Sequence, residues 1–207
     1  MAGGMKLFLF LLLSGCLGLS AGGASALWMG GLTRSGPQLG DAVRINGWTS
    51  DWSIGAEAAN PYVRARVARF GLLALRREEA VYFTTARDKD GKRLSDRCIY
   101  QVTGGTMPSD WWSITLYDRD SRLPMNEDGA LSFDATDAAR TGTGGAWSFR
   151  VSRDQNGHPD ELWVSSRNAG RFDLTLRLYL PSDALLEHPQ ATLQPPVVDE
   201  LYCDEAA

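Results

Sequence analysis

Residues 172–180 read FDLTLRLYL, an alternation of apolar and polar side chains that runs for nine positions. A period of two is typical of a β-strand with one face on a hydrophobic core and the other toward water. The apolar set, which we expect in the core, consists of Phe172, Leu174, Leu176, Leu178 and Leu180. Shorter stretches with similar alternation precede it at residues 81–85, 98–103, 112–117, 147–152 and 162–164.

The segments between these strands carry turn sequences. Glycine-containing turns occur at residues 90–91, 104–105, 128–129, 142–145, 156–157 and 169–170. Strands joined by turns, with no helical pattern between them, are typical of antiparallel architectures. The sequence therefore predicts a mainly β domain, an antiparallel β-sandwich or jelly-roll-like fold.

One amphipathic helix is expected before the first strand. Asn60 is a favourable N-cap, and Pro61 suits the first helical turn. Apolar side chains recur at helical spacing in Val63, Val67, Phe70 and Ala74, while another face carries Arg66, Arg69, Arg76 and Arg77. We expect the helix to end near Glu79. Its narrow apolar stripe favours packing on the β-domain over the alternative, binding to anionic lipid headgroups.

An uncharged segment of 23 residues runs from Leu7 to Met29. At about 1.5 Å per residue, a helix of this length crosses the roughly 30 Å hydrocarbon core of a bilayer. Three interpretations fit it: a retained anchor, which we favour, a signal peptide cut after residues 24–26, or a lipoprotein signal that lipidates Cys16. Each predicts the lipid bilayer as a partner through residues 7–29.

This segment sets the domain organisation that we predict. Residues 1–29 are the transmembrane anchor or signal segment, 30–59 a glycine-rich linker, 60–201 the β-sandwich domain and 202–207 a tail. Counting Lys6 against Arg34 and Arg44 slightly favours the domain inside. A short N-terminus before a strong apolar run usually acts as an export signal, so we expect the domain outside.

Composition narrows the classes of function. The chain has 207 residues, 43% of them hydrophobic and 22% charged, with a net charge of −4. These values exclude a disordered chain and a generally basic nucleic-acid binder, so no nucleic-acid partner is expected. Two histidines and three cysteines leave little material for a metal site.

No motif assigns a catalytic, cofactor or metal site. Gly-x-Ser-x-Gly does not occur, and His158 and His188 both lie in loops beside a proline. Residues 142–145 lack the lysine of a phosphate-binding loop. The acidic residues whose spacing matches no Ca²⁺ loop are Asp118, Asp120, Glu127 and Asp128. We therefore predict no catalytic residue, cofactor or metal ligand, and the balance favours a protein without catalysis.

Two cysteines give a conditional prediction. In an exported protein Cys98 and Cys203 could pair across a loop of about 100 residues and stabilise the fold by several kcal/mol. The alternative is two free thiols, with Cys98 buried in its strand.

Several blocks together resemble the family catalogued as domain of unknown function 1214. They are NPYVRARVA at 60–68, EAVYF at 79–83, CIYQVTGG at 98–105, WWSITLYD at 111–118, FDLTLRLYLP at 172–181 and QPPV at 194–197. The resemblance covers about residues 45–201. It implies a mostly β envelope domain of bacteria with no settled activity, and small members similarly begin with one hydrophobic span. It thus implies a single-pass protein of the inner membrane, with the domain expected in the periplasm.

The chain departs from the family in two loops. ELWVSS at 161–166 stands where members often have Asn-Trp-Leu-Pro, and MNED at 125–128 replaces an Asn-Arg-Tyr-like segment. If these loops form a site in relatives, this chain has altered it.

Three function classes follow. The first is a membrane-anchored structural or interaction module, which we favour, with its protein partner or glycan unidentified. The second is a module that binds a carbohydrate or another amphiphile through exposed aromatic side chains, with Trp111 and Trp163 as candidates because they fall opposite the core phase of their strands. The third is a hydrolase with a site assembled from loops.

Overall fold

The alternating strand at 172–180 becomes the centre of the larger of two β-sheets. The computed structural model describes residues 2–30, 41–55, 61–69, 75–141, 145–155 and 162–204. The strands are β1 (Ala42–Ile45), β2 (Trp48–Asp51), β3 (Ala80–Thr85), β4 (Cys98–Gly104), β5 (Ser109–Asp118), β6 (Ser132–Asp134), β7 (Trp147–Ser152), β8 (Trp163–Ser165), β9 (Phe172–Pro181) and β10 (Val197–Cys203). The helices are α1 (Ala2–Met29), α2 (Pro61–Arg69), α3 (Ala135–Ala139), α4 (Asp183–Glu187) and α5 (Pro189–Thr192).

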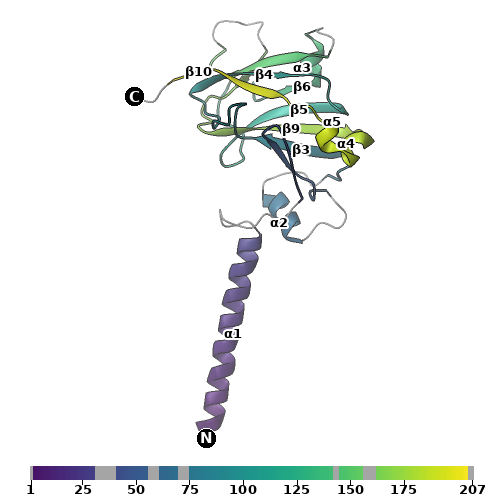
Figure 1. The fold of residues 1–207 in the computed structure, drawn as a ribbon. Helices are drawn as coiled ribbons and strands as arrows, with labels where there is room; N and C mark the ends of the chain where they lie inside the picture. Colours follow the sequence, from purple (N-terminus) through teal and green to yellow (C-terminus); the bar gives the residue numbers. More distant parts are fainter. Residues whose placement is uncertain are drawn as a thin grey trace.

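The strands form two sheets, which confirms the predicted mainly β fold. One sheet has six strands in the order β1-β2-β3-β9-β5-β6, and the other has four in the order β10-β4-β7-β8. The two sheets lie one above the other in Figure 1. Every strand pair is antiparallel except β7 with β8, which run parallel.

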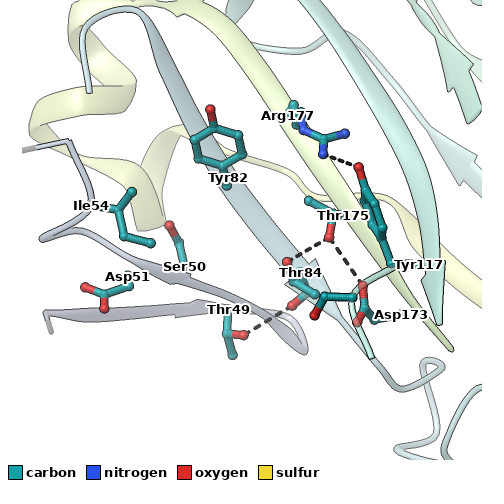
Figure 2. A pocket seen from close by; sticks show the side chains of 11 residues that line it. Thr49, Ser50, Asp51, Ile54, Tyr82, Thr84, Tyr117, Asp173, Thr175 and Arg177 are labelled. Atoms are coloured by element: carbon teal, nitrogen blue, oxygen red, sulfur yellow. Dashed lines mark hydrogen bonds between the residues drawn. The ribbon is translucent and has the colours of Figure 1, made fainter. Parts of the chain in front are cut away.

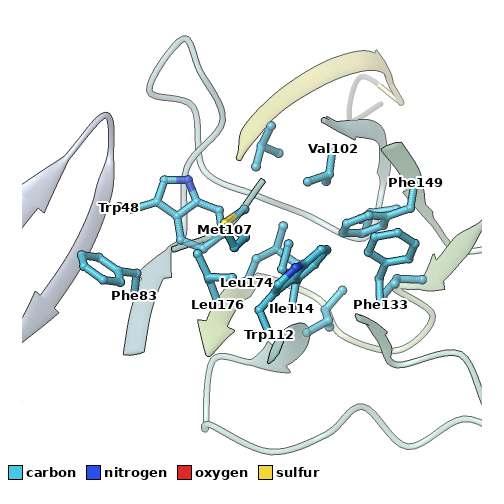
Figure 3. Close-up of a cluster of buried hydrophobic side chains, with 14 of the residues drawn as sticks. Trp48, Phe83, Val102, Met107, Trp112, Ile114, Phe133, Phe149, Leu174 and Leu176 are labelled. Atoms are coloured by element: carbon cyan, nitrogen blue, oxygen red, sulfur yellow. The ribbon is translucent and has the colours of Figure 1, made fainter. Parts of the chain in front are cut away.

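A continuous apolar core fills the space between the sheets. The leucines of β9 that face it are fully buried, as are Ile114 and Leu116 of β5. Figure 3 shows Leu174, Leu176 and Ile114 in one cluster with Phe83, Phe133 and Phe149. Burying one such side chain stabilises the fold by about 1.5–3 kcal/mol, so the apolar phase of the strands holds the sheets together.

The predicted core face of β9 is wrong at its last position. Leu180 is 57% exposed, because its backbone adopts a positive φ of 48° that turns the side chain outward. In this conformation the Leu180 N–H donates to the carbonyl of Glu79, 2.9 Å away, and Pro181 is buried instead.

The predicted end of the amphipathic helix is also wrong. Helix α2 is Pro61–Arg69, and residues 77–79 form a turn that leads into β3. Two contacts fix this turn: the Glu79 carboxylate accepts from the Arg76 N–H, and the Arg77 guanidinium donates to the carbonyl of Trp52. Of the predicted stripe, Val63 is buried. The side chains of Val67, Phe70 and Ala74, and those of Arg66 and Arg69, lie outside the described part of the chain.

A β-hairpin lies within the stretch that the sequence analysis assigns to the linker. Strands β1 and β2 pair around Asn46 and Gly47, whose φ values of 46° and 85° suit a two-residue turn of type I′. Trp48 is 1% exposed, and its indole N–H donates to the carbonyl of Pro196, 2.8 Å away. This hydrogen bond ties the hairpin to the segment before β10, so residues 41–52 complete the fold.

Helix α1 is long and apolar enough to cross a membrane. The 26 residues Gly4–Met29 qualify by length and hydropathy, and none of the most apolar window is buried by the rest of the protein. Figure 1 shows α1 projecting away from the two sheets. A signal sequence has the same properties, so this finding fits a signal segment as well as an anchor.

Candidate functional site

The outer face of the six-stranded sheet carries polar side chains in rows across three strands. One row consists of Tyr82, Arg177 and Ser113, and the next consists of Thr84, Thr175 and Thr115. Thr115 is 8% exposed and Thr175 is 7% exposed, although both point away from the core. The polar face is therefore covered at Thr115 and Thr175, while Tyr82, Thr84 and Arg177 are half-buried.

A cavity of about 350 Å³ opens between this face and the hairpin, and we call it the hairpin cavity. It lies where β2 is paired with β3 at one position, Thr49 with Thr84. Figure 2 shows the hairpin side chains across the cavity from those of β3, β5 and β9. The lining residues are Thr49, Ser50, Asp51, Ile54, Tyr82, Thr84, Tyr117, Ser121, Asp173, Thr175 and Arg177.

Arg177 places a positive charge on the wall of the cavity. Its guanidinium donates to the Thr115 hydroxyl, 2.9 Å away, and to the Tyr117 hydroxyl. The guanidinium carbon also lies 5.3 Å from the centre of the Tyr117 ring, a cation–π contact. Among the described residues no carboxylate lies within ion-pair distance of Arg177.

Hydroxyl groups lead from the middle of the cavity to a carboxylate. The Thr175 hydroxyl donates to Asp173 Oδ1 at 3.3 Å, and the hydroxyls of Thr84 and Thr175 are 3.1 Å apart. A hydroxyl has one proton, so Thr175 accepts from Thr84 when it donates to Asp173. The Thr49 hydroxyl donates to the carbonyl of Thr84 and joins the hairpin to this chain.

Burial changes the acid–base properties of two groups in the cavity. Burial raises the pKa of Asp173 to about 6, the nearby charge of Asp118 adds to this, and the Thr175 hydrogen bond opposes it. Burial also raises the pKa of Tyr82, while Arg177 lowers it. One carboxyl group of the cavity, that of Asp173, therefore gains a proton near pH 6.

The two tryptophans predicted to bind a ligand lie on different sheets. Trp111 of β5 is 38% exposed on the outer face, and its ring centre lies 5.4 Å from that of Tyr179. This pair occupies the row next to Arg177 and Tyr82. Trp163 of β8 is half-buried, and its indole N–H donates to the carbonyl and hydroxyl oxygens of Ser152. The structure therefore brings only Trp111 close to the hairpin cavity.

The cysteines lie far apart along the chain but meet in the fold. Cys203 of β10 is the strand partner of Cys98 in β4, and their sulfur atoms are bonded in the structure. Glu200 lies beside them. Within the part of the chain that the structure describes, Cys98, Glu200 and Cys203 form a group whose potential ligand atoms are close enough together to hold a metal ion. A sulfur atom in a disulfide cannot act as a thiolate ligand, so the two arrangements exclude each other. Cys16 is an exposed free cysteine on α1.

The acidic residues singled out from the sequence do not converge on one site. Asp118 accepts from the backbone N–H groups of Asp120 and Arg122 in its own turn. Asp128 instead accepts from the Ser165 hydroxyl at 2.6 Å and pairs with Arg167 at 3.0 Å. The Asp128 pKa is lowered by the Ser165 hydrogen bond and by Arg167. These carboxylates therefore stabilise loops.

The remaining candidates contribute no assembled site. His188 is exposed at the junction of α4 and α5. His158 and residues 142–144 lie outside the described part of the chain. Ser165 and Ser166 are fully buried, so neither is accessible as a nucleophile.

The sequence analysis missed the cavity residues Arg177, Asp173 and Thr175. They belong to residues 172–180, the alternating strand, and occupy the alternate positions that were expected to face solvent. The signal that could have found the site is Asn46-Gly47, a strong hairpin sequence, because a hairpin before β3 can cover an outer face.

The comparisons with known proteins identify a family but no activity. Residues 79–183 match the family described as "Protein of unknown function (DUF1214)". The search of curated proteins gives no match.

Two solved structures are similar to the chain. The VPA0106 protein from Vibrio parahaemolyticus is 22% identical, with a TM-score of 0.54 over 70% of this chain and 36% of that one. An uncharacterized protein from Burkholderia cenocepacia is 14% identical, with a TM-score of 0.40 over 58% of this chain and 29% of that one. The chain spans about a third of the length of the Vibrio protein, and this similarity supports the fold alone.

Proposed function

We propose a function from the geometry of the chain's own residues, since the chain belongs to the DUF1214 family, whose description names no activity. The proposed function is that of a membrane-tethered module that binds a small polar ligand in the hairpin cavity. The observation that carries this proposal is a covered polar face with a guanidinium that has no carboxylate partner among the described residues.

Burial of polar groups without a structural need supports a binding role. Covering hydroxyls and a charge costs free energy unless each group finds partners. The apolar phase of β9 already supplies the core, so the polar layer is not needed to hold the two sheets together. The volume of the hairpin cavity, about 350 Å³, also lies within the range of small-molecule sites.

The aromatic pair beside the cavity extends the surface that a ligand would contact. Trp111 and Tyr179 lie one row from Arg177 on the same face, at the usual strand spacing of about 7 Å for alternate residues. Aromatic rings beside hydroxyls and a charged group suit a carbohydrate or another amphiphile.

The N-terminal helix supports the membrane part of the proposal. We infer that α1 anchors the chain through residues 7–29 and that the domain lies in the periplasm of a bacterial cell. The bonded pair Cys98–Cys203 fits this placement, because disulfides persist in oxidising compartments. The intact mass of the protein from its native membranes tests both points. Full length supports the anchor, and a deficit of about two mass units that disappears on reduction supports the disulfide.

Ligand-induced stabilisation tests the binding function. The full-length protein in detergent would be heated with polyols, neutral sugars, sugar acids and sugar phosphates at high concentration. A ligand at 100 times its dissociation constant stabilises the folded state by about 2.7 kcal/mol. We expect at least one class to raise the Tm.

Two tryptophan variants locate the binding site. Ser50→Trp fills the hairpin cavity and should abolish the shift. Ser148→Trp changes the same residue type at an exposed position of the other sheet and should keep it. If no class raises the Tm, or if Ser50→Trp responds as Ser148→Trp does, the binding function is wrong.

A structural or interaction module is the second candidate, favoured by the loop between β5 and β6. Met125 in this loop is 87% exposed. Side-chain amides hold the loop in place: Asn126 donates to the carbonyl of Arg167, and Asn168 donates to that of Met125. An ordered loop with an exposed apolar tip suits contact with a protein partner. Crosslinking from this loop in native membranes, compared between wild type and Met125→Ser, tests this candidate.

A further inference from the structure

Resting on the binding function above, we propose that the hairpin cavity takes a phosphate-bearing polyol, with the phosphate at Arg177 and the polyol hydroxyls along Thr84 and Thr175. The proposal names the ligand class of the same site, and three features of the cavity carry it.

The first feature is the unused donor capacity of Arg177. A guanidinium has five N–H donors in a planar fork that matches phosphate geometry. Its hydrogen bonds go to the neutral hydroxyls of Thr115 and Tyr117. These partners fix the orientation of the side chain without neutralising it. An anion that reaches the cavity therefore meets a preoriented positive charge.

The second feature is the order of groups along β9. Arg177, Thr175 and Asp173 occupy alternate positions on one face, so they are spaced at about 7 Å intervals. Threonine hydroxyls both donate and accept, and Asp173 accepts when ionised. An anionic group fits one end of this row, and hydroxyl groups fit its middle and its other end.

The third feature is the placement of negative charge away from Arg177. Asp173 lies four residues along the strand, about 13 Å between the Cα atoms. Asp51 on the hairpin also lines the cavity, but it forms no ion pair with Arg177, and its Oδ1 accepts from the N–H and hydroxyl of Ser53 in its own turn. An anion is therefore attracted at the Arg177 end and repelled at the Asp173 end, which fixes the direction of the ligand.

The same chemistry has two sources, a lipid headgroup and a soluble metabolite. From Met29 to Ala42 the chain spans at most about 45 Å when fully extended. If α1 lies in the membrane, the hairpin that lines the cavity stays within this distance of the lipid headgroups. A headgroup built from phosphate and glycerol would then be the most abundant ligand of this class.

The first experiment measures binding of sn-glycerol 3-phosphate and of glycerol to the full-length protein in nanodiscs of zwitterionic phosphatidylcholine. We expect glycerol 3-phosphate to bind and glycerol to bind at least about tenfold more weakly, because a charge-assisted hydrogen bond is lost. Arg177→Gln should weaken binding of the phosphate by about tenfold or more. The matched control Arg97→Gln, an exposed arginine in the turn before β4, should leave it unchanged.

A second variant guards against misfolding of the first. Arg177→Lys keeps the charge but not the fork, so it should bind more weakly than wild type and more tightly than Arg177→Gln. If Arg177→Gln unfolds, the comparison of Arg177→Lys with wild type decides alone.

Nanodiscs that contain phosphatidylglycerol separate the two sources. If a headgroup occupies the cavity, the soluble phosphate binds more weakly in these discs than in phosphatidylcholine. If its affinity is equal in both discs, the ligand is a soluble phosphate.

The outcomes separate this inference from the binding function. The phosphate assignment is wrong, and the binding function stands, if neutral sugars raise the Tm but glycerol 3-phosphate does not bind. The same conclusion follows if Arg177→Lys and Arg97→Gln both bind glycerol 3-phosphate as tightly as wild type does. If no probe of any class binds, both are wrong.

Discussion

Neighbouring residues of β9 meet two different environments. On the inner face Leu174, Leu176 and Leu178 are fully buried among apolar side chains. On the outer face Thr175 is buried almost as deeply, but its neighbours are the Thr84 hydroxyl and the Asp173 carboxylate. The next side chain of β9 on this face is Arg177, two residues along the strand. The inner face gains stability from apolar contact itself, whereas the outer face depends on each polar group keeping its partner.

This difference shows that burial has two uses in one sheet. The inner face is filled by interdigitated side chains, while the outer face encloses a cavity of about 350 Å³. Small-molecule sites combine an open volume with a few fixed polar groups that orient the ligand, and the outer face provides both. The predictions below act on one face at a time, beginning with the largest expected effect.

Leu176→Ala should break the inner face. Removing a fully buried leucine side chain leaves a cavity in the core, which costs about 2–5 kcal/mol. Urea unfolding of the full-length protein in detergent, followed by tryptophan fluorescence, measures the loss. Thr175→Ser, one position away, keeps its hydroxyl and should cost less than about 1 kcal/mol. Equal losses for the two variants would contradict the division into faces.

Asp173→Asn should change the pH dependence of stability. The pKa of Asp173 in the folded protein is about 6, above its ordinary value of 3.8, so the folded state holds this proton more tightly than the unfolded state. The contribution of Asp173 to stability should therefore be fully present below about pH 4 and fall by about 3 kcal/mol as the pH rises through about 6.

The neutral side chain of the Asp173→Asn variant removes this contribution. Unfolding curves between pH 4 and 7 should then be flatter than those of wild type. Asp110→Asn, at an exposed position of β5, should keep the wild-type slope. The same slope in all three proteins would show that Asp173 is not buried by the hairpin.

Tyr117→Phe should weaken the outer face without removing the aromatic ring. The variant loses the hydroxyl that accepts from Arg177 but keeps the ring beneath the guanidinium. A hydrogen bond to a charged group contributes about 1.5–3 kcal/mol, and we expect a loss near the lower end of this range in urea unfolding because Tyr117 is half-buried. Tyr202→Phe, at an exposed position of β10, should change stability by less than about 0.5 kcal/mol. A silent Tyr117→Phe would mean that the ring contact alone holds Arg177.

Thr84→Val should have the smallest effect. Valine keeps the branched shape that suits a strand and loses only the hydroxyl that pairs with Thr175. The cost should be about 0.5–1 kcal/mol, because water in the cavity can replace the hydrogen bond. Thr103→Val on the exposed face of β4 is the matched control and should be neutral. A loss above about 2 kcal/mol would indicate that no water reaches Thr175.

The candidate site was less predictable than the fold, although the same strand carries both. Alternation in residues 172–180 correctly separated inner from outer side chains up to Tyr179, because strand geometry depends on nearest neighbours. It carried no information about what covers the outer side chains. The hairpin at 42–51 is more than 100 residues away in the sequence from Thr175 and Arg177, and no local pattern relates the two.

Local sequence accounts for the strands, their apolar phase and the long uncharged helix, since each depends on the spacing of side chains a few residues apart. It also nominated Cys98, Cys203 and Trp111 as candidates, without placing them in space. Contacts between distant residues accounted for the rest. The Trp48 hydrogen bond to Pro196 holds the hairpin in place, and the Leu180 N–H reaches Glu79 by a left-handed backbone conformation. The hairpin residues and the outer face of the sheet together line the cavity around Arg177. These features depend on which side chains meet across the sheets, and that is determined by the packing of the whole chain.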